Sequence, residues 1–329
     1  MKILFINSKK FDYSQDLTYA GLAALIGKSS IRDFPRHSSY HLNIKTYPKN
    51  LGYSPDGLLD IWRSQSINPK NCNLVVVGCP KPDALKSFFQ IREQIPDSIP
   101  IALVDGGDLE PIGGDATRLG HPELWQQTQK GRPFDFIFKR EYIKNKKYAA
   151  NVYPFPFCMN LNALSIQPDW RYDKQVTFWA VPSHPIREHA FEVLSGQFDC
   201  DQNGTARNLT FKNYKFKGRR YHKELSHSRV VISLRGGGWD TLRHWEVPAL
   251  GPLMVRQKLN IVIPNDFVEG EHMASCKDDL SDLIEVCQYY LEHETERLKM
   301  ARAAYEHLTK FHTHEVRAKY LLEKVSAKI

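Results

Sequence analysis

A glycine-rich turn makes residues 228–256 the most informative stretch of the sequence. The apolar run RVVISL leads into an Arg-Gly-Gly-Gly segment, and a helix is predicted directly after Asp240. Glycine lets the main chain take positive φ angles and lets a ligand approach it closely, and the free N–H groups at a helix start attract phosphate. The segment could therefore form a phosphate site from Gly236, Gly237 and Gly238, the N–H groups at the helix start, and the side chains of Arg235 and Arg243.

Two side chains of the predicted helix have chemistry suited to a nucleotide. Arg243 could form charge-assisted, bidentate bonds to phosphate oxygens. Glu246 could accept hydrogen bonds from two vicinal hydroxyls, such as those of a ribose. Plainer explanations stay open, because a Gly-Gly-Gly turn often only connects a strand to a helix, and an Arg–Glu pair three residues apart is often a surface ion pair. The loop also matches neither the G-x-G-x-x-G nor the Walker pattern.

Short apolar runs alternate with amphipathic stretches along the rest of the chain, which favours an α/β fold with parallel sheets covered on both faces. A helix beginning at residue 241 is expected to use Asp240 as its N-cap, and the last fifty residues show a helical apolar stripe. The expected strands are 2–7, 73–78, 101–104, 134–138, 176–181, 229–234, 253–256 and 260–263, with a weaker one at 42–47; the expected helices are 16–27, 81–94, 186–194 and 241–250.

The strand–helix alternation stops between residues 139 and 173, where three prolines and several basic residues gather. This break divides the chain into two α/β domains that face each other. We expect a first domain over residues 1–150, a linker over 151–173 and a second domain over 174–329. No internal repeat of solenoid period is present.

The composition of the 329 residues is that of a globular protein, with 42% hydrophobic and 25% charged residues. The net charge of +8 favours anionic partners without choosing among nucleotide phosphates, acidic lipid and nucleic acid. No apolar run approaches the ~18 residues of a membrane span, and the apolar run near the start is too short for a secretory signal, so we expect a cytoplasmic protein. The six cysteines show no C-x-x-C pair, which argues against a zinc site and a disulfide framework.

The stretch from residue 228 to 312 resembles the donor-binding domain of GT-B glycosyltransferases, especially the spore-maturation-type and exostosin-type groups. Those groups show an apolar strand that ends in an Arg-Gly loop, a helix of the form R-x-W/F-E-A-x-A-x-G-x-x-P, and a later helix containing YYL and an arginine. The first half of the chain is similar only in its α/β rhythm. The matching residues here are Arg235-Gly236, the run RHWEVPALG at 243–251, Phe267 to Gly270, Asp278-Asp279-Leu280, Tyr289-Tyr290-Leu291 and Arg297.

This resemblance implies two Rossmann-like domains with a cleft between them. It implies transfer of a sugar from a nucleoside diphosphate donor to a hydroxyl of a glycan, lipid or small-molecule acceptor. In that case Glu246 would hold the donor ribose, while residues 235–241 and Arg243 would face the diphosphate. Because arginines and a helix N-terminus can neutralise phosphate, we expect no metal and no cofactor besides the donor substrate. Many retaining members carry two glutamates eight positions apart, but Gly238 stands eight before Glu246, which favours an inverting transfer.

An inverting transfer needs a general base that deprotonates the acceptor hydroxyl. Asp105 and Asp108 are the candidates, because they follow an expected strand and would lie at the carboxyl edge of the sheet, where α/β proteins bind ligands. Asp16 is a weaker candidate. The alternative for the VDGGD run is a glycine turn with a helix-capping aspartate. His184 could bind phosphate or sugar, or be an exposed turn residue.

Two basic clusters with interleaved aromatic residues could attract an anionic membrane or an anionic glycan acceptor, or simply be solvated. No nucleic-acid-binding module signature occurs, so no nucleic-acid partner is expected. Two other functions stay open. One is a non-catalytic relative that binds a nucleotide or a glycan. The other is an unrelated nucleotide-binding enzyme such as a dehydrogenase or epimerase, although the first strand and its loop, KILFINSKK, lack the glycine fingerprint of such enzymes. The clusters are Lys139, Arg140, Lys144, Lys146 and Lys147, and Lys212, Lys215, Lys217, Arg219, Arg220 and Lys223.

Overall fold

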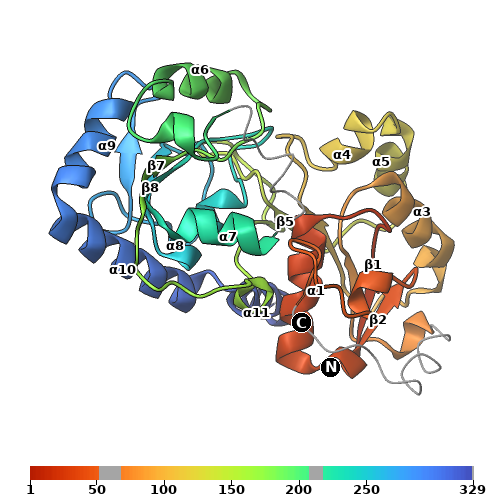
Figure 1. The fold of residues 1–329 in the computed structure, drawn as a ribbon. Coiled ribbons are helices and arrows are strands. Elements are labelled where there is room, and N and C mark those ends of the chain that lie inside the picture. Colours follow the sequence, from red (N-terminus) through yellow and green to blue (C-terminus); the bar gives the residue numbers. More distant parts are fainter. Residues whose placement is uncertain (52–67, 207–217, 328–329) are drawn as a thin grey trace.

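The protein consists of two α/β domains that lie side by side (Figure 1). The computed structural model describes residues 1–51, 68–206 and 218–327. Each domain contains one parallel sheet with helices packed on it, so the predicted fold class is confirmed.

The first domain is built on a six-stranded parallel sheet with the strand order β2-β1-β3-β4-β5-β6. Its central strands are short apolar runs that are buried at every position, as expected when helices cover both faces of a parallel sheet. The strands are β1 (Ile3–Ile6), β2 (Ile31–Phe34), β3 (Leu74–Val77), β4 (Ile101–Asp105), β5 (Phe136–Lys139) and β6 (Val152–Pro154).

The helices of the first domain come from both ends of the chain. The side chain of Asp12 caps the first helix by accepting a hydrogen bond from the Gln15 N–H at 3.0 Å. The last helix returns from the second domain and packs against that first helix, so the two chain ends are close together (Figure 1). Ala318, Leu321 and Val325 of the last helix belong to the same apolar core as Ile3. These helices are α1 (Tyr13–Ile26), α3 (Pro82–Ile91), α4 (Gly114–Arg118), α5 (Pro122–Gln129) and α11 (His314–Ser326).

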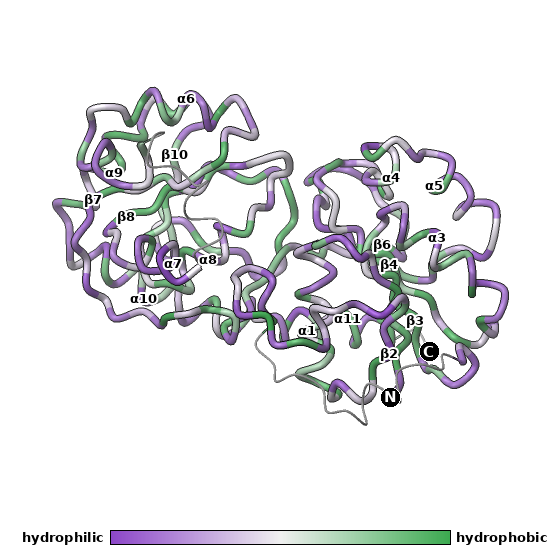
Figure 2. Tube along the Cα trace, turned by 45° about the vertical axis from the view of Figure 1, so that its right-hand side comes forward, coloured by the Kyte–Doolittle hydropathy of each residue, from purple (hydrophilic) through white to green (hydrophobic). Residues whose placement is uncertain are grey.

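The second domain has a four-stranded parallel sheet with the order β10-β9-β8-β7. Figure 2 shows the hydrophobic strands inside and more hydrophilic helices around them. The elements are β7 (Lys174–Thr177), α6 (Pro185–Leu194), α7 (Gly218–Ser226), β8 (Ser228–Ser233), α8 (Arg243–Leu250), β9 (Leu253–Gln257), β10 (Ala274–Cys276), α9 (Leu283–Glu292) and α10 (Glu294–Phe311).

Four details of the secondary structure differ from the sequence prediction. The second strand is Ile31–Phe34, not residues 42–47, because the IRDF run pairs with β1 along its whole length. The expected linker contains β6, so the first sheet continues past residue 150. Strand β10 was not predicted, and the expected strand at 260–263 forms only an isolated bridge between Ile261 and Ile143. A three-residue strand and a single bridge are too short to leave a periodic pattern in a sequence.

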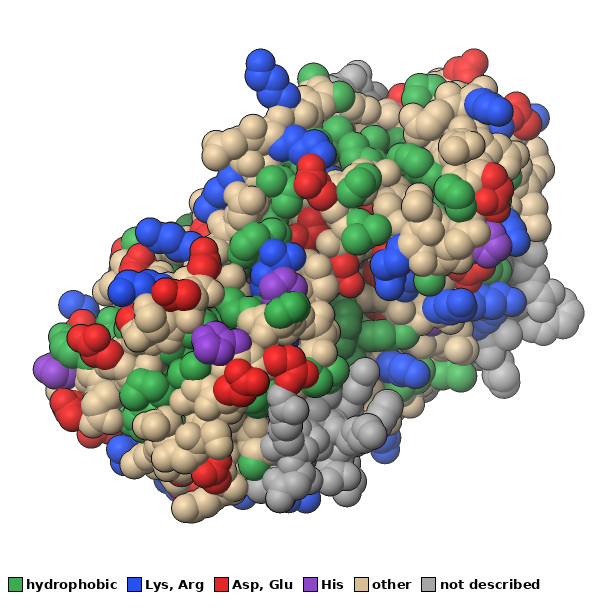
Figure 3. All heavy atoms as spheres, turned by 90° about the horizontal axis from the view of Figure 1, so that it is seen from above, with side chains coloured by type: hydrophobic (Ala, Val, Ile, Leu, Met, Phe, Trp, Pro, Cys, Tyr) green, Lys and Arg blue, Asp and Glu red, His purple; other side chains and the backbone are tan. Residues whose placement is uncertain are grey.

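The surface charge, the cysteines and the length of the helices give three further facts about the fold. Acidic and basic side chains are interspersed on the face seen in Figure 3. All six cysteines are free thiols, and five of them are buried. In the part of the chain that the structure describes, none of the helices has both the length and the apolar character needed to cross a membrane.

Candidate functional site

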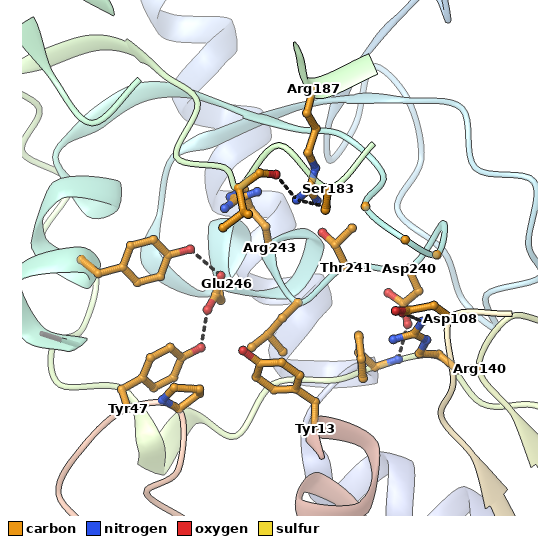
Figure 4. A pocket seen from close by; sticks show the side chains of 18 residues that line it. Tyr13, Tyr47, Asp108, Arg140, Ser183, Arg187, Asp240, Thr241, Arg243 and Glu246 are labelled. Atoms are coloured by element: carbon orange, nitrogen blue, oxygen red, sulfur yellow. Dashed lines mark hydrogen bonds and ion pairs between the residues drawn. The ribbon is translucent and has the colours of Figure 1, made fainter. Parts of the chain in front are cut away.

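A cavity of about 310 Å³ is lined by residues of both domains (Figure 4). Glu246 lies at one end of it, and Asp108 and Arg140 lie at the other. The first domain contributes residues from α1 and from the loops that follow strands, and the second domain contributes the glycine loop and the start of α8. The lining residues are Tyr13, Tyr47, Pro48, Asp108, Arg140, Phe157, Val181, Ser183, Arg187, Tyr221, Gly236, Gly237, Gly238, Asp240, Thr241, Leu242, Arg243 and Glu246.

Glu246 is a buried acid in the first turn of α8 that faces this cavity. The Tyr221 hydroxyl donates a hydrogen bond to Oε2 at 2.7 Å, and the Tyr47 hydroxyl donates to Oε1. Burial raises the pKa of Glu246, while the two phenols and the charge of Arg243 act in the opposite direction. Each carboxylate oxygen has a second lone pair, so Glu246 can still accept hydrogen bonds from a ligand.

The three glycines after β8 serve close packing and do not supply positive φ. None of Gly236, Gly237 and Gly238 has a left-handed φ, so that part of the sequence prediction was wrong. A Cβ atom on Gly237 would stand 2.9 Å from Oδ2 of Asp108, and one on Gly236 would stand 3.0 Å from the Arg187 guanidinium. Larger residues would therefore push these charged side chains away from the loop.

Two backbone N–H groups of the loop bind a carboxylate of the other domain. Glu141 accepts hydrogen bonds from the N–H of Trp239 at 2.9 Å and from that of Asp240 at 3.1 Å. Its neighbour Arg140 forms ion pairs with Glu141 at 3.2 Å and with Asp108. These two amides are thus occupied within the protein. Sequence reasoning missed Glu141, because it lies in the stretch taken as the start of a basic connecting region.

Asp240 is not the N-cap that the sequence predicted. Its Oδ1 accepts a hydrogen bond from Trp245 Nε1 at 2.9 Å, and its Oδ2 accepts one from the Phe157 N–H at 2.5 Å. Burial raises the pKa of Asp240 to about 7. Helix α8 begins at Arg243 with no side-chain cap. Its first-turn N–H groups are therefore not taken up by a capping side chain at the edge of the cavity.

Two buried arginines face the cavity without a carboxylate partner among the described residues. The Arg243 side chain is 6% exposed, and its Nε has no hydrogen-bond partner within the described chain. Arg187 donates to three backbone carbonyls, from Nε at 2.8 Å, NH2 at 3.0 Å and NH1 at 3.1 Å, and to the Ser183 hydroxyl at 3.1 Å. Burial, and next the positive charge of Arg243, lower the pKa of Arg187 to about 9. Two neighbouring cations without a counter-ion favour an anionic ligand. Arg187 stands in a helix that sequence reasoning had not connected with the site.

Three residues predicted to bind the donor do not line the cavity. The Arg235 guanidinium lies over the Trp239 ring, 4.0 Å from its centroid, and the Arg235 N–H donates to Gln257 Oε1 at 3.0 Å. His184 is the N-cap of α6, where Nδ1 accepts the Ile186 N–H at 3.2 Å. Their side chains support the loop and a helix start, whereas Gly236, Gly237, Gly238, Asp240, Thr241, Arg243 and Glu246 do line the cavity.

The two candidate bases occupy different environments. Asp105 is buried at the end of β4, pairs with Lys139 Nζ at 3.0 Å, accepts the Gly113 N–H at 3.2 Å, and does not line the cavity. Asp108 does line the cavity; its Oδ1 pairs with Arg140, and its side chain is 42% exposed. Asp108 is therefore the one of the two that a ligand in the cavity can reach.

The weaker candidate Asp16 lies on α1 beside a smaller, adjacent pocket. Its Oδ1 accepts the Tyr40 hydroxyl at 2.8 Å, and its Oδ2 has no partner among the described residues. Burial raises the pKa of Asp16 to about 7. Asp16 is thus a buried acid next to the site and does not line the main cavity.

The expected basic clusters divide between buried pairs and an open groove. In the first cluster, Lys139 and Arg140 are buried ion-pair partners of first-domain aspartates. In the second, Lys212, Lys215 and Lys217 lie outside the described residues. Its other members line a groove of about 580 Å³ that shares Tyr47 with the main cavity and is lined by no acidic residue of the described chain. The cations of this basic groove are Lys45, Arg219, Arg220 and Lys223.

The second domain matches a family model, and the fold of the whole chain matches several solved structures. Residues 186–323 match the family model described as Glycosyl transferase-like. The fold matches sucrose-phosphate synthase from Thermosynechococcus elongatus over 100% of both chains, with 12% identity and a TM-score of 0.61. It matches HepE from Anabaena, solved with UDP and glucose, over 99% of each chain, with 11% identity and a TM-score of 0.60. It also matches an alpha-glucosyltransferase, solved with UDP, over 99% of this chain and 100% of that chain, with 10% identity and a TM-score of 0.64.

The two facing Rossmann-like domains define the GT-B fold. The chain therefore has the fold that the sequence resemblance implied. The second domain is similar to the glycosyl transferase-like family over residues 186–323. A search of curated protein sequences gives no match.

Proposed function

We propose that the protein transfers a sugar from a uridine diphosphate donor to an acceptor hydroxyl, with the donor bound in the cavity between the domains. The observation that carries this proposal is the pair of buried arginines, Arg187 and Arg243, which form no ion pair within the described chain and lie next to the buried acid Glu246. The arginines and the start of α8 would neutralise the diphosphate. Glu246 would accept hydrogen bonds from the ribose. The solved HepE complexes with UDP and with UDP-glucose support this choice of donor.

The same arrangement supports a transfer without a metal ion. Two guanidinium groups and a helix N-terminus supply the positive charge that a leaving diphosphate requires. Among the described residues, no group of three or more His, Cys, Asp or Glu side chains is placed to hold a metal ion. Transfer rates that fall in EDTA and recover with Mg²⁺ or Mn²⁺ would overturn this part of the proposal.

We also propose an inverting transfer with Asp108 as the general base. Asp108 stands opposite the glycine loop, at the end of the cavity away from Glu246. No acid is present at position 238, although the Glu141 carboxylate lies against Gly238. That carboxylate already accepts two backbone hydrogen bonds and pairs with Arg140, so it is not free to attack or stabilise a sugar. NMR of the anomeric proton in the product tests the stereochemistry.

The acceptor is proposed to be a glycan, lipid or small molecule that bears a hydroxyl. The basic groove of Lys45, Arg219, Arg220 and Lys223 supports an acceptor with a negatively charged part, including a lipid head group at an anionic membrane surface. The alpha-glucosyltransferase neighbour has been solved with DNA, so single- and double-stranded DNA belong in the same acceptor panel. We expect charged glycans or lipids, and not DNA, to be glycosylated, because no nucleic-acid module signature is present.

Titration of UDP by calorimetry tests the central proposal. We expect wild-type protein to bind UDP and Glu246→Gln to bind it at least tenfold more weakly, because a neutral amide is a poorer acceptor for two hydroxyls. The exposed Glu285→Gln on α9 is the matched control. Absence of UDP binding at millimolar concentration, or equal affinity of wild type and Glu246→Gln, would remove the proposal. An assay with a panel of UDP-sugars distinguishes an enzyme from a non-catalytic binder, because only an enzyme hydrolyses a donor or transfers its sugar.

A further inference from the structure

Tyr47 belongs to the first half of the chain, but its side chain is part of the second domain's core. It is 7% exposed and clusters with Trp179, Tyr221 and Leu225 of that domain. The His222 ring meets the Tyr47 ring edge-on, with 4.2 Å between the centroids. Tyr47 therefore holds the described segment that follows β2, residues 35–51, against the second domain beside the cavity.

The Tyr47 hydroxyl is one of two phenols that hold the Glu246 carboxylate. Tyr47 donates to Oε1, and Tyr221, on α7, donates to Oε2 at 2.7 Å. Each domain thus supplies one phenol to the same acid. Figure 4 labels Tyr47 and Glu246 of this contact. Two fixed donors, one on each oxygen, set the rotation of the carboxylate and direct its remaining lone pairs.

The charged and titratable groups around Glu246 make these two phenols important for its ionisation. Burial raises the pKa of Glu246, and the hydrogen bonds from Tyr47 and Tyr221 lower it more than the charge of Arg243 does. Tyr13, on α1, is the other titratable neighbour, and burial keeps its phenol neutral by raising its pKa. His222, packed on Tyr47, has a pKa lowered by burial to about 4, so it is neutral at pH 7. Loss of either phenol therefore favours the protonated acid.

We propose that Tyr47 and Tyr221 are positioning residues that orient Glu246 for the donor ribose, so that the nucleotide site is complete only when Tyr47 of the first domain is packed on the second. This inference rests on the proposed function, in which Glu246 binds the ribose. It adds that the first domain helps to build the donor site through Tyr47.

Phenylalanine variants test the inference, because they keep the ring and remove only the hydroxyl. We expect Tyr47→Phe and Tyr221→Phe each to weaken UDP binding about tenfold at pH 7, as loss of a hydrogen bond to a charged group does. UDP affinity should fall as the pH is lowered toward the raised pKa of Glu246, and the midpoint of this fall should move to higher pH in both variants. Inorganic pyrophosphate, which has no ribose, should bind both variants and wild type equally. The exposed Tyr289→Phe is the matched control.

The outcomes separate this inference from the proposed function. UDP affinity that is unchanged or stronger in Tyr47→Phe would overturn the inference, because the phenol would then be irrelevant to the ribose or compete with it. An equal loss of UDP and pyrophosphate binding, or an unmoved pH profile, would overturn it as well, because the effect would then be structural. If Glu246→Gln itself left UDP binding unchanged, the proposed function would fail first.

Discussion

The Glu141 carboxylate of the first domain accepts a hydrogen bond from the Trp239 N–H of the second, with 2.9 Å between oxygen and nitrogen. The same carboxylate accepts the Asp240 N–H and pairs with the buried Arg140. One acidic side chain therefore fixes the glycine loop from across the cavity. The carboxylate also carries negative charge, so a donor phosphate is expected to bind nearer Arg243 and Arg187 than Trp239.

Removal of the Glu141 carboxylate should destabilise the protein. Glu141→Ala leaves two loop N–H groups without their acceptor and removes one of the two acidic partners of Arg140, and buried groups that lose a partner cost about 1–3 kcal/mol each. Urea unfolding should show a loss of at least this size, with a smaller loss in Glu141→Gln, whose amide oxygen can still accept. Glu285→Ala is the control, and equal midpoints for it and Glu141→Ala would contradict the prediction.

Arg243 should contribute to UDP affinity more than to folding, because it forms no ion pair with an acid among the described residues. We expect Arg243→Gln to weaken UDP binding by roughly 10- to 100-fold, the range for a charge-assisted hydrogen bond. The affinity of wild type should fall as salt rises, and the variant should show a weaker salt dependence. Calorimetry at two ionic strengths measures both effects. The exposed Lys299→Gln should behave as wild type, and a similar loss in it would argue for non-specific attraction.

Asp105 and Asp108 should give different phenotypes although they are three residues apart. Asp108→Asn should lower kcat at least a hundredfold and leave UDP affinity within threefold, because a general base contributes about 10²–10⁴ in rate. Asp105→Asn should instead lower stability, since it removes one charge of a buried ion pair with Lys139. Transfer assays and urea unfolding of both variants check this. An active Asp108→Asn protein would remove Asp108 from the mechanism.

Asp16 and Asp240 should each make a contribution to protein stability that falls as the pH rises from about 4 to about 7. Burial raises the pKa of Asp16 from 3.8 to about 7 in the folded state, and Asp240 shifts likewise. In this window the folded protein holds protons that the unfolded chain has released, so the stabilisation is full below the unfolded pKa and is lost as the pH passes the folded pKa. Three pKa units correspond to at most about 4 kcal/mol per group.

The neutral isostere Asp16→Asn isolates the contribution of one of these acids. Its free energy of unfolding should decline less steeply than that of wild type between pH 4.5 and 7.5, measured by urea unfolding at several pH values. The control is Asp97→Asn, whose side chain is fully exposed. Parallel curves for wild type and Asp16→Asn would show that Asp16 titrates as an ordinary carboxylate.

The sequence predicted the parts of the site that lie on one continuous segment. The glycine loop, Arg243 and Glu246 follow one another between β8 and α8, so their types and spacing were sufficient to group them. Asp108 was predicted as a candidate base because it follows a strand of the first domain's sheet. The same reasoning gave most strands of both sheets, since each is a short apolar run bounded by polar residues.

The parts that the sequence could not predict depend on contacts across the cavity. Tyr47, Glu141 and Arg187 come from three separate segments, and nothing in their local sequence shows that they meet the glycine loop or Glu246. Asp240 looked like a helix cap, but its carboxylate is taken by Trp245 and the Phe157 amide. The pattern of one segment cannot predict whether a side chain caps the next helix or binds a distant part of the chain.

The return of α11 to the first domain has a practical consequence for work with isolated parts of the protein. Because Ala318, Leu321 and Val325 of α11 are packed with β-strand residues from the opposite end of the chain, no single cut yields both domains intact. A fragment ending near residue 173 would expose the apolar surface that α11 covers. A fragment starting there would carry an unpaired amphipathic helix. Expressing the first domain alone will require fusing residues 314–327 to it through an artificial connection.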